Sequence, residues 1–326
     1  MRDLERCPGC NADGQRVFAT SISKPAAELR DDWSVQVAHM HRHVIERDEQ
    51  ELGAVFCPRC GLVYLSPTFD DDELGRLYSH EAWLRMRGEL EALASTADVS
   101  LSEVEERGRA FRPHFVRSRI DRHVRGPVSS LVDFGGGDGL YLRELAAPGR
   151  RRFVYDVTLP ERLEPGIEGI GREEDLVARA PYDLVLTMNT LEHVTFPGQT
   201  IELFRRITKP GAHVYIEVPY EFSGLVYTKK VTLNYHINFF SKLSLENLFR
   251  RQGFRAVSIE IAFLPVDQYE FYALVGVFRR EADPLPMRRP GLAWKAEIVE
   301  AGFRRLRERL HRRFAFARIP WAKASA

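Results

Sequence analysis

Short apolar runs alternate with segments of helical periodicity over most of the chain after residue 100. The apolar runs are bounded by polar or turn residues, and they predict buried strands at residues 131–134, 152–157, 183–188 and 213–218. Helical spacing predicts helices at about residues 102–123, 198–207 and 243–252. Gly253 follows the last helix as its expected end, and two further strands, at about 254–263 and 271–279, form a hairpin-like pair. This alternation predicts an α/β fold whose mostly parallel sheet is covered by helices on both faces.

One segment, LVDFGGGDGL at residues 131–140, predicts a buried strand, a glycine turn and the start of a helix. Gly135, Gly137 and Gly139 allow the backbone to turn sharply and to approach a ligand closely. A dinucleotide-binding fingerprint needs glycine at the sixth position of this run, but Leu140 stands there. The turn leads into a helix N-terminus, where free N–H groups favour anionic or electron-rich ligand groups.

Further candidate residues follow the carboxyl ends of the neighbouring predicted strands. Asp156 ends the second strand, and its two carboxylate oxygens can accept hydrogen bonds from two ribose hydroxyls. Asn189 follows the strand predicted at residues 183–188 and is expected to lie at the same edge. Ligands of open α/β sheets bind at this edge, so we expect these residues to surround one site.

All four cysteines occur in two C-x-x-C pairs, formed by Cys7 with Cys10 and by Cys57 with Cys60. Two such pairs can supply the four thiolates of a tetrahedral zinc site, and a fully protein-ligated site is typically structural. The alternatives are reduced thiols without a ligand or a redox pair. The site would stabilise a small N-terminal module that buries too little core by itself.

Between the cysteine pairs, residues 35–44 alternate in polarity and predict a strand with His39, His41 and His43 on one face. A solvated face is the preferred interpretation, and a substrate-contacting face is the alternative. At the other end of the chain, Phe303, Leu306, Leu310 and Phe314 form an apolar stripe on a basic background, which predicts an amphipathic helix.

The chain has 326 residues and a net charge of +1, so no global field favours nucleic acid. The first ten residues lack the apolar core of a signal peptide, and no apolar run approaches the length of a membrane span, so a cytoplasmic protein is expected. The predicted organisation is a zinc-binding module with a hinge, an α/β domain and a basic C-terminal helix, at residues 1–85, 86–282 and 283–326.

Several motifs resemble class I S-adenosylmethionine-dependent methyltransferases: LVDFGGGDG with the acidic Asp133, the position of Asp156, YDLVLTMNTLEHV and PGAHVYIEVP. The resemblance implies a Rossmann-like sheet that binds S-adenosylmethionine with the glycine loop, Asp133, Asp156 and Asn189. The cysteine pairs, in CPGC and CPRCGLVYLSP, are similar to the zinc-binding module of bacterial deoxysugar and glycan methyltransferases. This likeness implies a small-molecule acceptor that is linked to a sugar.

The chain departs from that group in one motif. Sugar C-methyltransferases carry Tyr-His-Glu-His, whereas this chain has Tyr235, His236, Ile237 and Asn238. The acid and the final histidine, which is the proposed base for enolate formation, are therefore missing. This departure favours methylation of a hydroxyl or an amine.

The first candidate base for such an acceptor is His193, because it follows the third strand and an imidazole suits proton transfer. Its alternative role is to open a helix. His236 is the second candidate, with Tyr235 as an orienting hydroxyl. Sugar C-methylation, RNA methylation that uses the zinc module and basic tail, and a non-catalytic cofactor-binding protein remain alternatives. A homodimer is possible.

Overall fold

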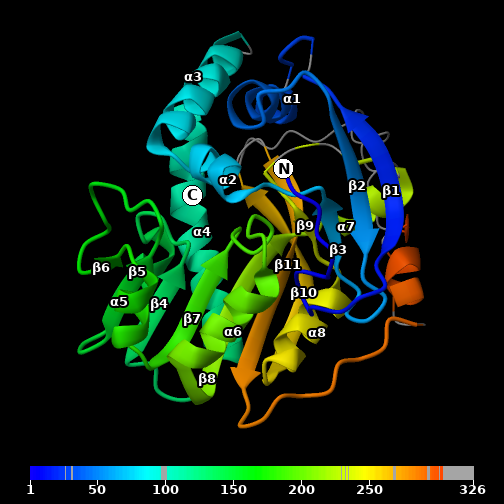
Figure 1. The fold of residues 1–326 in the computed structure, drawn as a ribbon. Coiled ribbons are helices and arrows are strands. Elements are labelled where there is room, and N and C mark those ends of the chain that lie inside the picture. Colours follow the sequence, from blue (N-terminus) through cyan, green and yellow to red (C-terminus); the bar gives the residue numbers. More distant parts are fainter. Residues whose placement is uncertain are drawn as a thin grey trace.

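The computed structural model describes residues 1–25, 27–30, 32–96, 101–228, 230–231, 233, 235–266, 269–291, 294–300 and 302–303. A seven-stranded sheet lies at its centre, with the strand order β10-β11-β8-β7-β4-β5-β6 (Figure 1). The strands are β4 (Ser130–Phe134), β5 (Arg151–Tyr155), β6 (Glu168–Ile170), β7 (Tyr182–Met188), β8 (Thr208–Pro219), β10 (Phe254–Val266) and β11 (Tyr269–Arg280). Strands β8, β7, β4, β5 and β6 run parallel, and β11 pairs antiparallel with both β8 and β10. The predicted fold class, with its closing antiparallel pair, is confirmed.

Helices cover both faces of this sheet, which explains why its central strands β4 and β7 are buried along their whole length. On one face, α4 (Leu101–His123) and the 3₁₀-helix η2 (Leu140–Leu145) pack against Leu131 and Leu184. Val132 and Val185 belong to the core of the opposite face. That face is covered by α5 (Glu173–Ala178), α6 (Pro197–Ile207) and α8 (Lys242–Arg251), as Figure 1 shows for α6 and α8. Successive side chains of a strand thus enter different cores.

The N-terminal residues form a second sheet in the order β1-β2-β3-β9. Its strands are β1 (Arg16–Ser23), β2 (Gln50–Phe56), β3 (Val63–Ser66) and β9 (Asn238–Phe239), and the last comes from a distant part of the sequence. Three α-helices complete this region, namely α1 (Asp32–His39), α2 (Asp71–Leu77) and α3 (His80–Thr96). Asp70 caps α2 in a capping box with Glu73. The pairing of β3 with β9 ties the N-terminal sheet to the segment that carries His236.

The prediction of a strand at residues 35–44 was wrong. This segment forms α1 and the π-helix η1 (Met40–Val44). His39 and His41 are buried, so the solvated-face interpretation is also wrong. The polar alternation overlaps with apolar residues at helical spacing, and the buried side chains of Val37, Met40 and Val44 follow that longer period.

After β8, a short helix α7 (Phe222–Thr228) precedes the loop that leads to β9. Residues 294–300 and 302–303 are helical, and Trp294 packs against Phe56 and Phe222. Of the predicted C-terminal stripe, Phe303 is 70% exposed, and the rest lies outside the described residues. Within the part of the chain that the structure describes, no helix combines the length and apolar character needed to cross a bilayer.

Candidate functional site

The glycine loop joins β4 to η2 at the carboxyl edge of the sheet. Gly135, Gly137 and Gly139 all have positive φ angles, of 73°, 53° and 83°. A Cβ on Gly135 would lie 2.5 Å from Thr190, and one on Gly139 would lie 2.7 Å from Ile167, so these positions exclude larger residues. A Cβ on Gly137 would meet nothing within 4 Å. The loop therefore packs tightly on two sides, while its middle glycine faces open space that a ligand can enter. The helix that follows is a 3₁₀-helix of six residues.

Asp133 lies below this loop as a buried, unpaired acid. It is 0% exposed, and neither carboxylate oxygen accepts a hydrogen bond from the described residues. Burial, with a contribution from Asp156, raises the pKa of Asp133 to about 8. A Cβ on Gly136 would lie 2.5 Å from the Asp133 Cγ, so the glycine leaves room for the carboxyl group. A buried acid without a donor is suited to a cationic ligand group.

Asp156 follows β5 and contacts the same loop. One of its oxygens accepts a hydrogen bond from the Gly137 N–H at 3.0 Å, and the other accepts one from the Thr158 N–H at 3.0 Å. Asn189 follows β7 with a positive φ of 50°, and its N–H donates to the Glu217 carbonyl. The structure thus places both predicted residues at the edge that carries the glycine loop.

The two candidate bases come together from separate loops. His193 follows β7, His236 precedes β9, and their ring centroids are 4.9 Å apart. Glu192 is 1% exposed, and its Oε1 lies 3.6 Å from Nε2 of His193. Glu221, in the loop after β8, accepts a hydrogen bond from Nδ1 of His236 at 2.8 Å. The result is a cluster of two acids and two histidines at the carboxyl edge of the sheet, which we call the acid–histidine cluster.

Opposite protonation states are expected for the two rings. Burial and the nearby charge of His236 lower the pKa of His193 to about 3, so this imidazole is neutral. Although burial opposes it, the ion pair with Glu221 raises the pKa of His236 to about 9. Burial raises the pKa of Glu192 to about 8, although His236 opposes the shift. His193 therefore keeps a ring lone pair next to a charged neighbour.

Backbone contacts orient His193 within this cluster. Its Nδ1 donates to the Tyr235 carbonyl at 2.9 Å, which leaves Nε2 as the nitrogen with the lone pair. Tyr235 therefore orients His193 through its carbonyl, whereas its hydroxyl contacts the sulfur of Met86 on α3. The Asn238 amide donates to the carbonyls of Leu191 and Val194, at 3.1 and 2.7 Å. Asn238 thus holds the loop that carries His193.

Sequence analysis did not select Glu192 or Glu221 as site residues. Glu192 had a local signal, because it directly precedes His193 after a predicted strand. Glu221 follows β8 by two residues, and its pairing with His236 arises when the folded chain brings the two loops together.

The four cysteines also meet at one point. Sγ of Cys7 lies 3.7 Å from Sγ of Cys60, and Sγ of Cys10 lies 3.6 Å from Sγ of Cys57. These distances are too long for disulfides, but they approach the separation of about 3.8 Å expected for thiolates 2.3 Å from a tetrahedral zinc ion. All four are buried. The cluster could therefore hold one Zn²⁺.

Tight contacts attach the cysteine cluster to the helices of the large sheet. A Cβ on Gly198, at the start of α6, would lie 2.1 Å from the Gly9 carbonyl oxygen. The Asn247 amide of α8 donates to the Cys60 carbonyl at 3.1 Å. The first and second cysteine pairs thus each pack on a helix of the α/β body.

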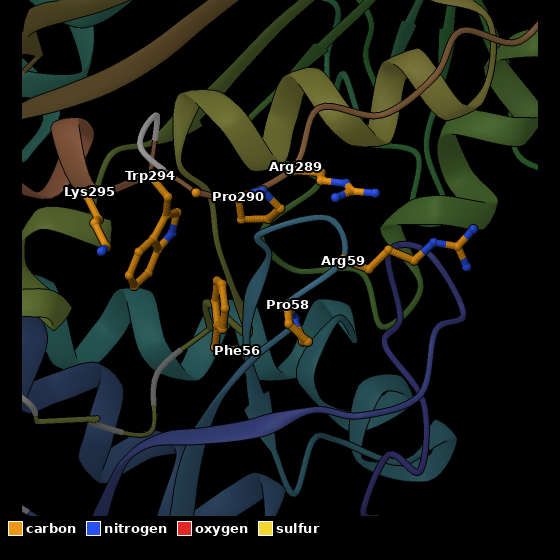
Figure 2. A pocket seen from close by; sticks show the side chains of 8 residues that line it. Phe56, Pro58, Arg59, Arg289, Pro290, Trp294 and Lys295 are labelled. Carbon is orange, nitrogen blue, oxygen red and sulfur yellow. The ribbon is translucent and has the colours of Figure 1, made fainter.

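A cavity of about 530 Å³ lies between the second cysteine pair and the C-terminal segment (Figure 2). Phe56 and Trp294 form an aromatic wall, with ring centroids 4.7 Å apart. Arg59, Arg289 and Lys295 also line it, so its charged lining residues are all basic. A second cavity of about 530 Å³ is lined in part by Glu173, Phe134 and Thr195.

Comparison with known proteins identifies the central domain. Residues 109–259 match the family model described as a methyltransferase domain. Curated relatives include the ubiquinone biosynthesis O-methyltransferase of Paraburkholderia xenovorans, which is 32% identical over 110 residues, or 30% of this chain and 47% of the relative. The same enzyme of Azotobacter vinelandii is 31% identical over 108 residues, or 29% and 47% of the two chains. The chain thus spans about half the length of the curated relatives it matches.

Solved structures with similar folds were also found. A chain from the complex between the Haloferax volcanii Trm112 methyltransferase activator and the putative methyltransferase has 20% identity and a TM-score of 0.43, with 55% and 94% of the chains covered. An amino pentose methyltransferase from Micromonospora echinaspora has 13% identity and a TM-score of 0.43, with 56% and 97% covered. The family match confirms the prediction of a class I S-adenosylmethionine-dependent methyltransferase domain.

Proposed function

We propose that this chain, with its methyltransferase domain at residues 109–259, transfers a methyl group from S-adenosylmethionine to a small-molecule acceptor. The supporting observation is the glycine loop with the buried Asp133 beneath it, whose carboxyl accepts no hydrogen bond from the part of the chain that the structure describes. The open space at Gly137 permits close approach of a ligand, and the positive charge of this cofactor would favour the ionised form of Asp133, whose pKa burial raises to about 8. When bound, the cofactor supplies an activated methyl group on a sulfonium. The loop, Asp156 and Asn189 are proposed to bind it.

The acceptor is proposed to be a hydroxyl or an amine of a sugar-linked molecule. His193 offers the Nε2 lone pair for the acceptor proton, because its Nδ1 is bonded to a backbone carbonyl. Carbon methylation is less compatible with this site, because Ile237 is apolar and the Asn238 amide is committed to backbone carbonyls. The curated relatives are named O-methyltransferases, in agreement with an oxygen acceptor. The sugar rests on the likeness of the cysteine module to that of deoxysugar methyltransferases.

The cysteine cluster is proposed to bind a structural Zn²⁺. Its thiol separations suit tetrahedral coordination, and four cysteines leave no ligand position for an acceptor. The ion would hold the first and second cysteine pairs against α6 and α8.

The test is a turnover assay by mass spectrometry. The zinc-loaded protein is mixed with S-adenosylmethionine and a panel of nucleotide sugars in keto and non-keto forms. We expect one product that is heavier by one methyl substitution, with fragmentation that places the methyl on oxygen or nitrogen. Gly137→Val should abolish cofactor binding measured by calorimetry, because its side chain would fill the open space. Absence of cofactor binding by the unaltered chain would overturn the proposal.

A further inference from the structure

The acid–histidine cluster has the composition of a metal site that is separate from the cysteine cluster. Glu192, His193 and His236 each offer one ligand atom, and these atoms all lie within 4.8 Å of one another. Glu192 is buried, and both histidines are partly buried, with side chains 20% and 21% exposed. Three donors therefore meet at a point that solvent and an acceptor can still reach.

Contacts behind the rings resemble those that orient histidine ligands in metalloproteins. Such histidines bind the ion through one nitrogen and donate the other N–H to a carbonyl or carboxylate. Nδ1 of His193 donates to the Tyr235 carbonyl at 2.9 Å, and Nδ1 of His236 donates to Glu221 at 2.8 Å. For His193, Nε2 is thus the nitrogen that the ring directs to the cluster, 3.6 Å from Oε1 of Glu192.

The charges of the cluster also suit a divalent cation. Neither oxygen of Glu192 accepts a hydrogen bond from the described residues, so this buried acid lacks a partner that would stabilise its charge. With Glu221 behind His236, the cluster contains two carboxylates and two imidazoles. Binding of the ion would release one proton from Glu192 and one from His236, and the resulting cluster charge of −2 would balance one divalent ion.

We propose that Glu192, His193 and His236 bind one divalent transition-metal ion. Two imidazoles and one carboxylate favour ions such as Mn²⁺, Fe²⁺, Co²⁺ or Zn²⁺ over Mg²⁺ and Ca²⁺, which prefer oxygen ligands. Ligands about 2.1 Å from a tetrahedral ion lie about 3.4 Å apart, and Oε1 of Glu192 lies 3.6 Å from Nε2 of His193. Binding of an ion would draw the three ligand atoms, which lie within 4.8 Å of one another, closer together. Three protein ligands leave positions open for water or a substrate oxygen.

A catalytic role for the ion rests on the proposed methyl transfer, whereas binding of the ion does not. An acceptor hydroxyl bound to the ion loses its proton to a water molecule, because the cation lowers the pKa of the hydroxyl. The resulting oxygen attacks the methyl carbon, a C–O bond forms, and the carbon–sulfur bond breaks. The products are a methyl ether and S-adenosylhomocysteine. When the ion is bound, Nε2 of His193 is a metal ligand and a water molecule takes the acceptor proton; without the ion, Nε2 of His193 takes this proton as proposed above.

The experiment is a Mn²⁺ titration followed by electron paramagnetic resonance. The protein is first loaded with one Zn²⁺ per chain to fill the cysteine cluster. Mn²⁺ does not displace zinc from thiolates, so added Mn²⁺ reports on other sites. We expect one bound Mn²⁺ per chain, and electron spin-echo envelope modulation should show nitrogen couplings from two imidazoles. Glu192→Gln should weaken binding at least tenfold, and His236→Gln should remove one nitrogen coupling. The matched control is the double variant His114→Gln and Glu144→Gln, because the exposed His114 and the partly buried Glu144 have the same 3.6 Å separation.

The outcomes distinguish failure of the proposed metal site from failure of the proposed methyl transfer. Failure of the zinc-loaded protein to bind Mn²⁺ at 1 mM, or equal binding by Glu192→Gln, overturns the metal site and leaves the proposed function untouched. Mn²⁺ binding with two nitrogen couplings supports the site even if no acceptor is methylated, in which case only the proposed function fails. Turnover that is unchanged in metal-free buffer overturns the catalytic role of the ion.

Discussion

Replacement of Asp133 by asparagine should stabilise the cofactor-free protein, although it removes a residue proposed to bind the cofactor. Asp133 is 0% exposed, and its oxygens accept no hydrogen bonds from the described residues. Burial, with a contribution from Asp156, raises its pKa to about 8. Asparagine has nearly the same shape and cannot ionise. The variant therefore avoids a free-energy cost of folding: at neutral pH the wild-type carboxyl is ionised in the unfolded chain, but burial disfavours its ionised form in the folded state.

The sign and size of the effect follow from proton linkage. Because the folded pKa of Asp133 lies above the unfolded value, the folded state holds the proton longer, and the free energy of unfolding falls as pH rises between the two values. With about 3.9 for the unfolded pKa and about 8 for the folded pKa, the penalty is about 1.5 kcal/mol at pH 5 and about 4 kcal/mol at pH 7. The stability advantage of the variant should thus grow by about 2.5 kcal/mol over this range.

Urea unfolding at pH 5 and pH 7, followed by circular dichroism, measures this difference. Asp183→Asn is the matched control on the adjacent strand β7. Although burial opposes it, the ion pair with Lys209 and hydrogen bonds from Ser129 and Ser130 lower the pKa of Asp183 to about 2. Its replacement should destabilise the protein by about 2 kcal/mol, equally at both pH values. If the advantage of Asp133→Asn does not change with pH while the control behaves as expected, burial does not hold Asp133 protonated.

Three further predictions concern the parts that support the site. Removal of zinc by a chelator should lower the thermal unfolding temperature by at least 5 °C by differential scanning calorimetry, and added Zn²⁺ should restore it. Gly198→Ala should destabilise the protein by about 2–3 kcal/mol in urea, because its Cβ would lie 2.1 Å from the Gly9 carbonyl, whereas Gly75→Ala, with nothing within 4 Å, should not. Asn238→Ala should lower kcat at least tenfold with little change in cofactor affinity, because the loop of His193 loses two hydrogen bonds; an unchanged kcat would contradict this role.

The glycine loop, the central strands and the cysteine pairs could be predicted from the sequence, because each depends on residues that are close together in the chain. The glycine loop was predictable because positive φ angles at Gly135, Gly137 and Gly139 strongly favour glycine. The central strands β4 and β7 were predictable because both faces of the sheet are covered, so that each contains a buried apolar run, whereas the edge strand β6 has no such run and was not predicted. The cysteine pairs were recognisable by spacing alone, and the fold brings their thiols together as expected.

Sequence analysis assigned the wrong secondary structure to a segment in which strand-like and helix-like periodicities overlap. Residues 35–44 alternate like a strand, yet tertiary packing selects a helical period that buries His39 and His41. Propensity and polarity differ little between the two choices over ten residues, so contacts with the rest of the N-terminal region decide between them.

By itself, the sequence determined the fold class, the glycine loop and the identity of the candidate cysteine ligands. Only the tertiary structure decided that the Glu192 carboxyl is buried and accepts no hydrogen bond from the described residues, that Glu221 pairs with His236, and that Tyr235 orients His193 through its carbonyl. The physical reason is that these properties belong to contacts between loops far apart in sequence. Burial and the charge of a distant neighbour determine the protonation of a side chain, and neither is present in the pattern around it.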